Sequence, residues 1–224
     1  MKKLMIFLLC PILFLVACNK EPDFSYPEGM VGTSKIIYYP TIAIKGERLI
    51  IIDQGTPYTD SGAVAVLNGE DIEPQVEGSV DSNTPGVYEL NYSASNPEGF
   101  SVTDFRTVVV MSTDEQVSSN DFSGTYNREV TGVDAVWTKV GRGVYQVDNP
   151  GGAGVGAGFI VTLVNYEGNE ISIPRQMAFD PSIGGMNVIS SNSEEYEATA
   201  SPVMVHYALT AGGYGDQLRD FVKK

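Results

Sequence analysis

Short runs of β-branched and aromatic residues, separated by glycine and proline, recur along this chain from about residue 38 to its end. No long stretch after residue 20 spaces its apolar residues at the helical period of 3.6. Valine, isoleucine, threonine and tyrosine favour extended backbone, while the 24 glycines and 12 prolines favour turns. The pattern therefore predicts an all-β protein.

A polar run at residues 112–120 divides the chain almost in half, and a chain of this length fits one or two domains. We expect five segments. These are a signal peptide (1–17), an N-terminal tether (18–37), a first β domain (38–111), a linker (112–121) and a second β domain (122–224).

The first residues have the form of an export signal. Lys2 and Lys3 precede an apolar run at residues 4–17. A run of 14 residues is short for a membrane span, which needs about 20. We therefore expect this segment to be removed.

The tetrapeptide Leu15-Val16-Ala17-Cys18 resembles the lipobox of bacterial lipoproteins. The resemblance implies that the Cys18 thiol is acylated and becomes the new N-terminus. Acyl chains bury at about 0.8 kcal/mol per methylene, so a multiply acylated cysteine anchors a protein to a membrane. The alternative is an ordinary signal peptide with a chance cysteine. The following charged residues 19–23 resemble tags that send lipoproteins to the outer face of the outer membrane, so we expect a surface location there.

Cysteine content and charge limit the chemistry of the mature chain. Cys10 leaves with the signal, so no thiol remains for a disulfide, a nucleophile or a zinc cluster. The chain has 14 basic and 28 acidic residues, and the loss of Lys2 and Lys3 leaves a net charge of −16. Such a surface repels phosphate backbones, which argues against nucleic-acid binding.

The first half has strand candidates at the spacing of a β-sandwich, at residues 39–45, 49–52, 87–92 and 106–110. In the third of these, alternation places Tyr88, Leu90 and Tyr92 on one face. Several features, in this order along the chain, resemble those of the Ig-like domain of bacterial surface proteins. In such proteins, Ig-like domains serve as spacers. These features are Gly55-x-x-Tyr58-x-Asp60-x-Gly62-Ala63, Val80-Asp81, Gly86-x-Tyr88-x-x-x-Tyr92 and Arg106-x-Val108-x-Val110. The resemblance implies a fold and no catalytic residue.

The second half also alternates strand candidates with turns. We expect residues 136–140 to pair with residues 144–147 across Gly141-Arg142-Gly143. Further candidates are 123–128, 159–164, 170–173, 186–189, 196–200 and 203–209. We expect an antiparallel meander, either a small sandwich or a lipocalin-like barrel.

Two phrases of the second half resemble the C-terminal domain of lipoproteins from starch-utilisation-type glycan uptake clusters. They are Gly124-Thr125-Tyr126 and Lys139-Val140-Gly141-x-Gly143-Val144-Tyr145. The resemblance implies a role in glycan uptake.

Motifs for catalysis or metal binding are weak. His206 is the single histidine, which disfavours a Ser-His-Asp relay. The glycine-rich residues 152–157 lead into a strand candidate rather than the helix that phosphate binding requires. Asp53, Asp60 and Asp71 lack the spacing of a calcium loop. We expect no enzyme, cofactor or metal site.

Aromatic side chains are the better indication of a site, because sugars stack on tryptophan and tyrosine rings. Trp137, Tyr145 and Tyr214 are the candidate ligand-binding residues, and Tyr166 and Tyr196 are further aromatics. The alternative for Trp137 and Tyr145 is that they fill the core. We expect an accessory carbohydrate-binding surface lipoprotein. The other hypothesis is a non-catalytic structural or adhesin-like subunit that docks to a protein in the outer membrane.

Overall fold

The computed structural model describes residues 27–31, 34–213 and 215–224. The chain forms two compact units, residues 1–38 and residues 39–224. In the first unit, β1 (Met30–Val31) pairs antiparallel with β2 (Ser34–Lys35). Within the described ranges, no helix combines the length and the apolar character needed to cross a membrane. The signal segment and Cys18 lie outside the described residues, so the lipid anchor stays a prediction.

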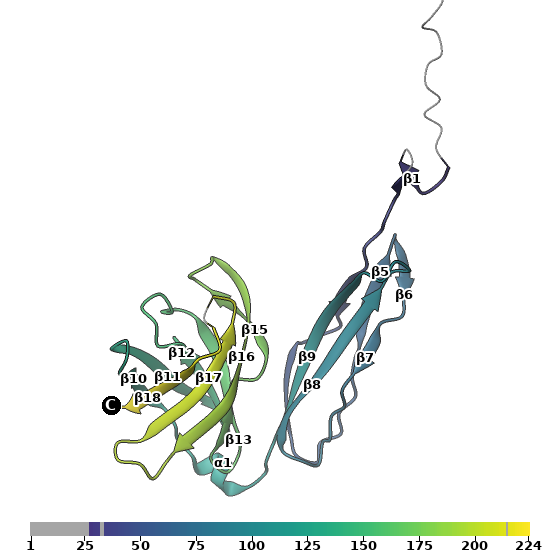
Figure 1. Ribbon diagram of the computed structural model, residues 1–224. Coiled ribbons are helices and arrows are strands. Elements are labelled where there is room, and N and C mark those ends of the chain that lie inside the picture. The colour runs from purple at the N-terminus through teal and green to yellow at the C-terminus, as the bar shows by residue number, and fades with distance from the viewer. Residues whose placement is uncertain (1–26, 32–33, 214) are drawn as a thin grey trace, which may run out of the picture. The chain divides into compact units, whose positions relative to one another are not determined.

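The second unit is built almost wholly of strands, which confirms the all-β prediction (Figure 1). Its first part contains β3 (Thr41–Ile44), β4 (Leu49–Asp53), β5 (Ala63–Leu67), β6 (Glu70–Ile72), β7 (Gln75–Glu77), β8 (Gly86–Ser95) and β9 (Ser101–Met111). These strands form two sheets, in the orders β3-β5-β6 and β4-β9-β8-β7. All pairs are antiparallel except β4 with β9. Two sheets of short strands match the predicted Ig-like sandwich.

The predicted alternation along β8 is confirmed. Leu90 and Tyr92 are buried, whereas Glu89 and Asn91 are exposed. With Ala63 the two buried residues form the apolar core of this domain. Alternate burial is what a strand with one face on the core requires.

A polar network lies beside that core, and its members come from the phrases that carry the Ig-like resemblance. Arg106 is fully buried and pairs with Asp60. The Asp60 carboxylate also accepts hydrogen bonds from Tyr92 Oη at 2.8 Å, Tyr58 Oη at 3.1 Å and the Gly62 amide at 3.1 Å. Burial would raise the pKa of Asp60, but these hydrogen bonds and the charge of Arg106 outweigh it and lower the pKa. The residues of this network that belong to the Ig-like phrases therefore have a structural role in the fold.

A short helix, α1 (Glu115–Ser119), lies inside the polar run predicted as a linker. Its single buried residue, Val117, packs in an apolar cluster with Val109, Met111 and Val164. Just before the helix, the Ser112 amide donates to the Tyr166 carbonyl at 2.7 Å. The run is thus held by backbone and side-chain contacts with β13.

The second half forms one antiparallel sheet. Its strands are β10 (Gly124–Arg128), β11 (Val133–Gly141), β12 (Val144–Asp148), β13 (Ile160–Glu167), β14 (Glu170–Ser172), β15 (Gln176–Asp180), β16 (Gly185–Glu197), β17 (Met204–Ala211) and β18 (Leu218–Lys223). Successive strands pair with one another except β14 and β15, and β18 returns to pair with β10. The predicted hairpin across residues 141–143 is confirmed as β11 with β12.

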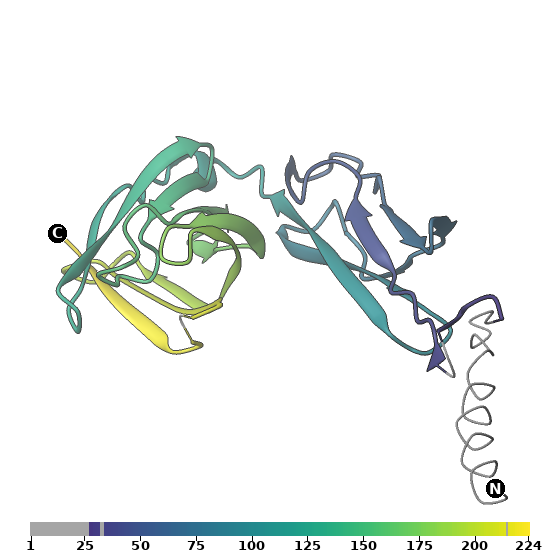
Figure 2. The ribbon, with the colours of Figure 1, turned by 90° about the horizontal axis from the view of Figure 1, so that it is seen from above.

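This sheet curls round on itself (Figure 2), and its two edge strands are β14 and β15. β14 pairs with β13 and β15 pairs with β16, while only residues 173–175 separate β14 from β15. In that connection the Ile173 carbonyl accepts from the Ser191 amide of β16 at 2.9 Å. The Gln176 side chain bridges to β13, accepting from Thr162 N at 2.8 Å and donating to Thr162 O at 2.7 Å. The prediction left a sandwich and a barrel open, and the structure of this half is therefore a barrel.

Aromatic and aliphatic side chains fill the barrel interior. The buried cluster contains Phe122, Tyr126, Ala135, Trp137, Tyr145, Val147, Phe159, Val161, Leu163, Ile171, Ile173, Ala178, Ile189, Val205, Tyr207, Leu209 and Phe221. Any binding surface formed by these strands must accordingly lie on the outside or at an end of the barrel.

Candidate functional site

Two of the three predicted ligand-binding aromatics belong to the core. Trp137 is 2% exposed and Tyr145 is 0% exposed. The Trp137 ring lies 4.7 Å from Tyr126 and 6.4 Å from Tyr145 between centroids, and Tyr145 Oη donates to the Asn120 carbonyl. A sugar cannot stack on a ring whose faces are covered by neighbours. We therefore correct this assignment: Trp137 and Tyr145 fill the core, as the alternative stated.

The third candidate, Tyr214, lies outside the described residues, so its role stays a prediction. Of the two further aromatics, Tyr166 is half-buried against the apolar cluster of Val109 and Met111. Tyr196 is also half-buried, but it lines a hollow in the surface. Of the five aromatic residues named in the sequence analysis, Tyr196 is therefore the one that lies at a candidate site in the described structure.

The hollow lies where β16 ends, and we call it the Tyr196 hollow. Its lining residues are Asn169, Glu195, Tyr196, Glu197 and residues 198–200. The Tyr196 ring stacks on Phe122 with centroids 3.9 Å apart, and its hydroxyl lies 3.4 Å from that of Tyr126. A ring packed in this way loses less side-chain entropy on binding than a free one.

The lining of the Tyr196 hollow is rich in hydrogen-bonding groups. Glu195 and Glu197 offer carboxylate acceptors, and the Asn169 amide supplies both a donor and an acceptor. Asn169 comes from the turn between β13 and β14, so the hollow combines residues far apart in the sequence. This set of groups can bind a ligand that has hydroxyls and an apolar face.

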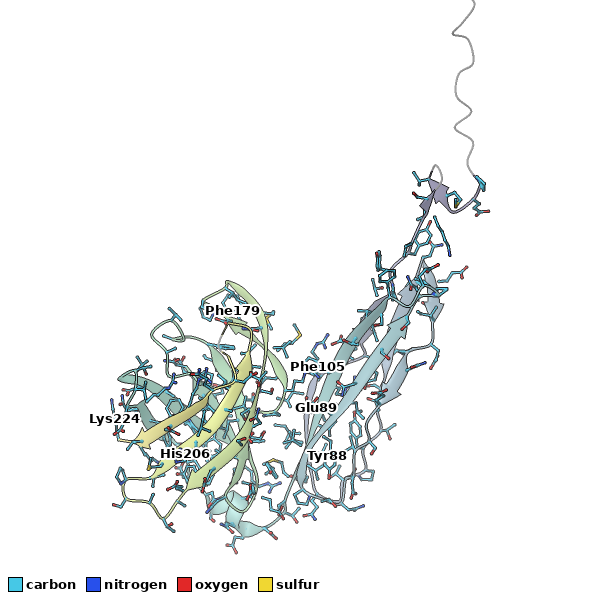
Figure 3. All side chains as sticks on the ribbon, in the orientation of Figure 1. Tyr88, Glu89, Phe105, Phe179, His206 and Lys224 are labelled. Atoms are coloured by element: carbon cyan, nitrogen blue, oxygen red, sulfur yellow. The ribbon has the colours of Figure 1, made fainter. Side chains whose placement is uncertain are left out.

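His206, which is labelled in Figure 3, lies on β17 and contacts Glu197 of the hollow. Its Nε2 is 3.0 Å from Glu197 Oε1, and its Nδ1 is 2.7 Å from Asp220 Oδ1 of β18. Glu195 is its direct neighbour in the β16–β17 pairing. Burial would lower the pKa of His206, but the bonds and charges of Asp220 and Glu197 outweigh it and raise the pKa. His206 therefore holds Glu197, one of the residues that line the hollow.

A second surface is apolar, and we call it the β15–β16 face. Met177 of β15 lies opposite Val188 of β16, and Phe179 lies opposite Met186. Their exposed fractions are 38% for Met177 and Val188, 55% for Met186 and 56% for Phe179. Ile183, in the turn between the strands, is 60% exposed. Exposed apolar side chains grouped in this way are typical of a contact surface.

The other motifs form no site in the described part of the chain. Asp53 pairs with Arg142 and Asp60 pairs with Arg106, so these aspartates do not converge with Asp71 on one point. No group of three or more metal-binding side chains is present among the described residues. The glycine-rich residues 152–157 lead into β13, a strand, as expected.

Comparison with known proteins identifies the first domain. Residues 42–110 match the family described as bacterial surface protein, Ig-like domain. No curated protein matches the chain. A crystal structure of a lipoprotein from Bacteroides thetaiotaomicron covers 83% of this chain and 100% of its own, with 26% sequence identity and a TM-score of 0.36.

Residues 42–110 are thus similar to the Ig-like domains of bacterial surface proteins. The family match ends at residue 110, before the barrel begins. The resemblance of the barrel to the C-terminal domain of glycan-uptake lipoproteins therefore stays a prediction.

Proposed function

We propose that this chain is a non-catalytic surface lipoprotein that binds carbohydrate in the Tyr196 hollow and serves a glycan-uptake system of the outer membrane. The observation that carries the proposal is an aromatic ring, backed by Phe122, within a lining of carboxylates and an amide. The Ig-like domain serves as the spacer between the lipid-anchored Cys18 and the barrel. No cofactor or metal takes part.

The lining suits a neutral sugar better than a charged one. Glu195 and Glu197 repel acidic sugars, whereas their oxygens accept hydrogen bonds from ring hydroxyls. The apolar face of a pyranose can lie against Tyr196, in the way that aromatic side chains combine apolar and polar contacts at interfaces. We therefore expect neutral polysaccharides as ligands.

Affinity electrophoresis of residues 19–224 through gels containing a panel of polysaccharides tests the proposal. We expect retardation by a neutral glycan, and loss of that retardation in Tyr196→Ala and Glu195→Gln. Glu195 is exposed, so its variant keeps the fold even if Tyr196→Ala disturbs the packing on Phe122. Glu70→Gln, an exposed residue of β6, is the matched control. Failure of every glycan to retard the parent protein would exclude carbohydrate binding.

The second candidate function is a subunit that docks to a protein partner and does not bind sugar. The β15–β16 face favours it, since the face is apolar and exposed. If no glycan retards the protein but Phe179→Ser releases the chain from a larger complex in detergent extracts, the docking function replaces the first proposal. Val130→Ser, on an exposed turn elsewhere on the barrel, is the control.

The surface anchor has its own test. Cys18→Ala should move the chain from the membrane fraction to the soluble fraction, because the acyl chains then have no attachment point. Persistence of the variant in the membrane fraction would contradict the lipoprotein assignment.

A further inference from the structure

Two arginines face inward at the end of the barrel where β10 finishes. Alternation along β10 places Arg128 on the same side of the strand as the buried Tyr126. Alternation along β18 places Arg219, which is 4% exposed, on the same side as the buried Phe221. β10 and β18 are neighbouring strands of the sheet. The two guanidinium groups therefore belong to one region, which we call the Arg128 end of the barrel.

The buried Tyr207 of β17 indicates that both positive charges lie close to one point. Its hydroxyl donates to the Pro150 carbonyl at 2.7 Å. Burial raises the pKa of Tyr207, and the charges of Arg219 and Arg128 act in the opposite direction. A charge has such an effect only over a short distance. The Arg128 end therefore concentrates positive charge.

The loop after β12 holds the Arg128 side chain in place. Arg128 Nη1 donates to the Gly151 carbonyl at 3.1 Å. Gly152 has φ +52°, and a Cβ there would lie 2.8 Å from both Arg128 Cβ and Phe221 Cε1. The loop is fixed in turn by Thr131 Oγ1, which donates to the Gly152 carbonyl at 2.6 Å. Glycine at position 152 thus allows the loop backbone to lie directly against Arg128.

Arg128 differs from most arginines of this chain in having no carboxylate partner. The arginine–carboxylate pairs are Arg48–Asp104, Arg106–Asp60, Arg142–Asp53 and Arg175–Glu89. Within the described ranges, the Arg128 side chain makes one hydrogen bond, to Gly151, although a guanidinium has five N–H donors. Its buried Nε has no partner in that part of the chain. The charge of Arg128 is therefore left uncompensated.

A partly buried cation without a counter-charge is unfavourable. The acidic residues nearest to it in the sequence of β11 and β12 have other partners, since Asp134 pairs with Lys224 and Asp148 accepts from the Gly158 amide at 2.7 Å. Arg128 is only half-buried, so solutes can reach part of its guanidinium. The planar guanidinium can donate two parallel hydrogen bonds to a carboxylate or to a tetrahedral oxyanion. An external oxyanion would therefore supply the missing counter-charge.

We propose that the Arg128 end of the barrel binds the oxyanion group of a small acidic ligand, a carboxylate or a sulfate. Arg128 contacts the group, and Arg219 adds a second positive charge. This inference does not rest on the Tyr196 hollow. Tyr196 packs on Phe122, which precedes β10, whereas Arg128 is the last residue of that strand. The acidic remainder of the protein repels anions, so we expect the binding to be weak.

An NMR titration of residues 19–224 tests the site through the side-chain N–H of Arg128. The Nε atom is buried, so its proton exchanges slowly enough to be observed, and its disappearance in Arg128→Lys assigns the resonance. We expect the resonance to shift saturably with sodium sulfate or sodium galacturonate while sodium chloride keeps the ionic strength constant. Chloride alone should produce no saturable shift.

Variants separate binding at Arg128 from a general effect of charge. With the Gly151 backbone amide as the probe, we expect Arg128→Gln to weaken anion binding at least about tenfold, because the charged fork is lost. Lys45→Gln removes one positive charge from an exposed position of the Ig-like domain and should leave binding unchanged. Arg128→Lys should give an intermediate affinity, because it keeps the charge without the fork. Thermal midpoints show whether each variant is folded.

The two anions distinguish the ligand groups. A response to galacturonate alone identifies a carboxylate site, a response to sulfate alone identifies a sulfate site, and each supports the proposal. The absence of a saturable response to both, or equal affinity in Arg128→Gln and the parent, would overturn it. Neither result bears on the Tyr196 hollow, which is tested with Tyr196→Ala and Glu195→Gln.

Discussion

Arg106 and Asp60 form an ion pair in which the arginine side chain is 0% exposed and the aspartate is 26% exposed. The guanidinium also donates to the carbonyls of Lys45 and Glu47, so it joins β9 to the segment between β3 and β4. Removal of one partner from such a pair leaves the other buried without compensation. The pair is therefore essential to the Ig-like fold.

We predict that Asp60→Ala lowers the free energy of unfolding of this domain by about 3 kcal/mol, because Arg106 then stays buried without its charge partner. Urea denaturation, followed by a probe in the Ig-like domain, measures the loss. Asp71→Ala, at an exposed position of β6, should change stability by less than about 0.5 kcal/mol. Equal effects for the two variants would contradict the structural role of Asp60.

Trp137 gives a second prediction. Its indole Nε1 is buried and has no hydrogen-bond partner among the described residues. Trp137→Phe should therefore cost only the smaller cavity that the phenyl ring leaves, since the lost N–H makes no bond there, whereas Trp137→Ala should cost about 3–5 kcal/mol through the larger cavity. Thermal unfolding of both variants checks the order. A loss in Trp137→Phe as large as that in Trp137→Ala would contradict this order.

The two glycines of the β11–β12 hairpin should respond differently to alanine. Gly143 has φ +63°, and a Cβ there would lie 2.4 Å from both the Asn165 carbonyl oxygen and Met111 Cε. Gly141 has ordinary backbone, and its nearest neighbour for an added Cβ is Val144 at 3.5 Å. We predict that Gly143→Ala destabilises by more than 1 kcal/mol and that Gly141→Ala is close to neutral. Denaturant midpoints of the two variants test the contrast.

His206 makes stability depend on pH. Its pKa is raised in the folded state, so its stabilising contribution is fully present below the unfolded value of about 6.5 and is lost as pH rises through the folded pKa. We predict that His206→Gln is less stable than the parent at pH 5.5, by up to about 1 kcal/mol, and that the difference shrinks at pH 9. Urea midpoints at both pH values measure it. A constant difference would show that the charge of His206 does not contribute.

Strand positions were predictable where apolar and turn residues alternate clearly. The β11–β12 hairpin and the buried side of β8 follow from the sequence. β15 and β18 were missed, because polar residues occupy inward positions there. Gln176 and Asp180 are buried on β15, as is Arg219 on β18. The strand predicted at residues 196–200 was wrong in extent, because β16 ends at Glu197 and a turn follows.

The candidate site was less predictable than the fold. Burial separates Tyr196 from Trp137 and Tyr145, but all three lie in runs with strand character. Asn169 reaches the Tyr196 hollow only through the closure of the barrel, which no local pattern reveals. The β15–β16 face requires the pairing of Met177 with Val188, and this register is a tertiary property. The sequence therefore indicated that an aromatic residue forms the candidate site, but not which surface carries it.

β14 pairs with β13 and β15 pairs with β16, but β14 and β15 do not pair with each other. The barrel wall therefore has a longitudinal seam at these strands. Along it, the Gln176 side-chain amide takes the place of a backbone neighbour for Thr162. A side chain can change rotamer, whereas a ladder of backbone hydrogen bonds opens only when a strand detaches. The seam is thus the part of the wall where local opening costs least free energy, and amide exchange at Thr162 reports that opening without unfolding of the whole domain.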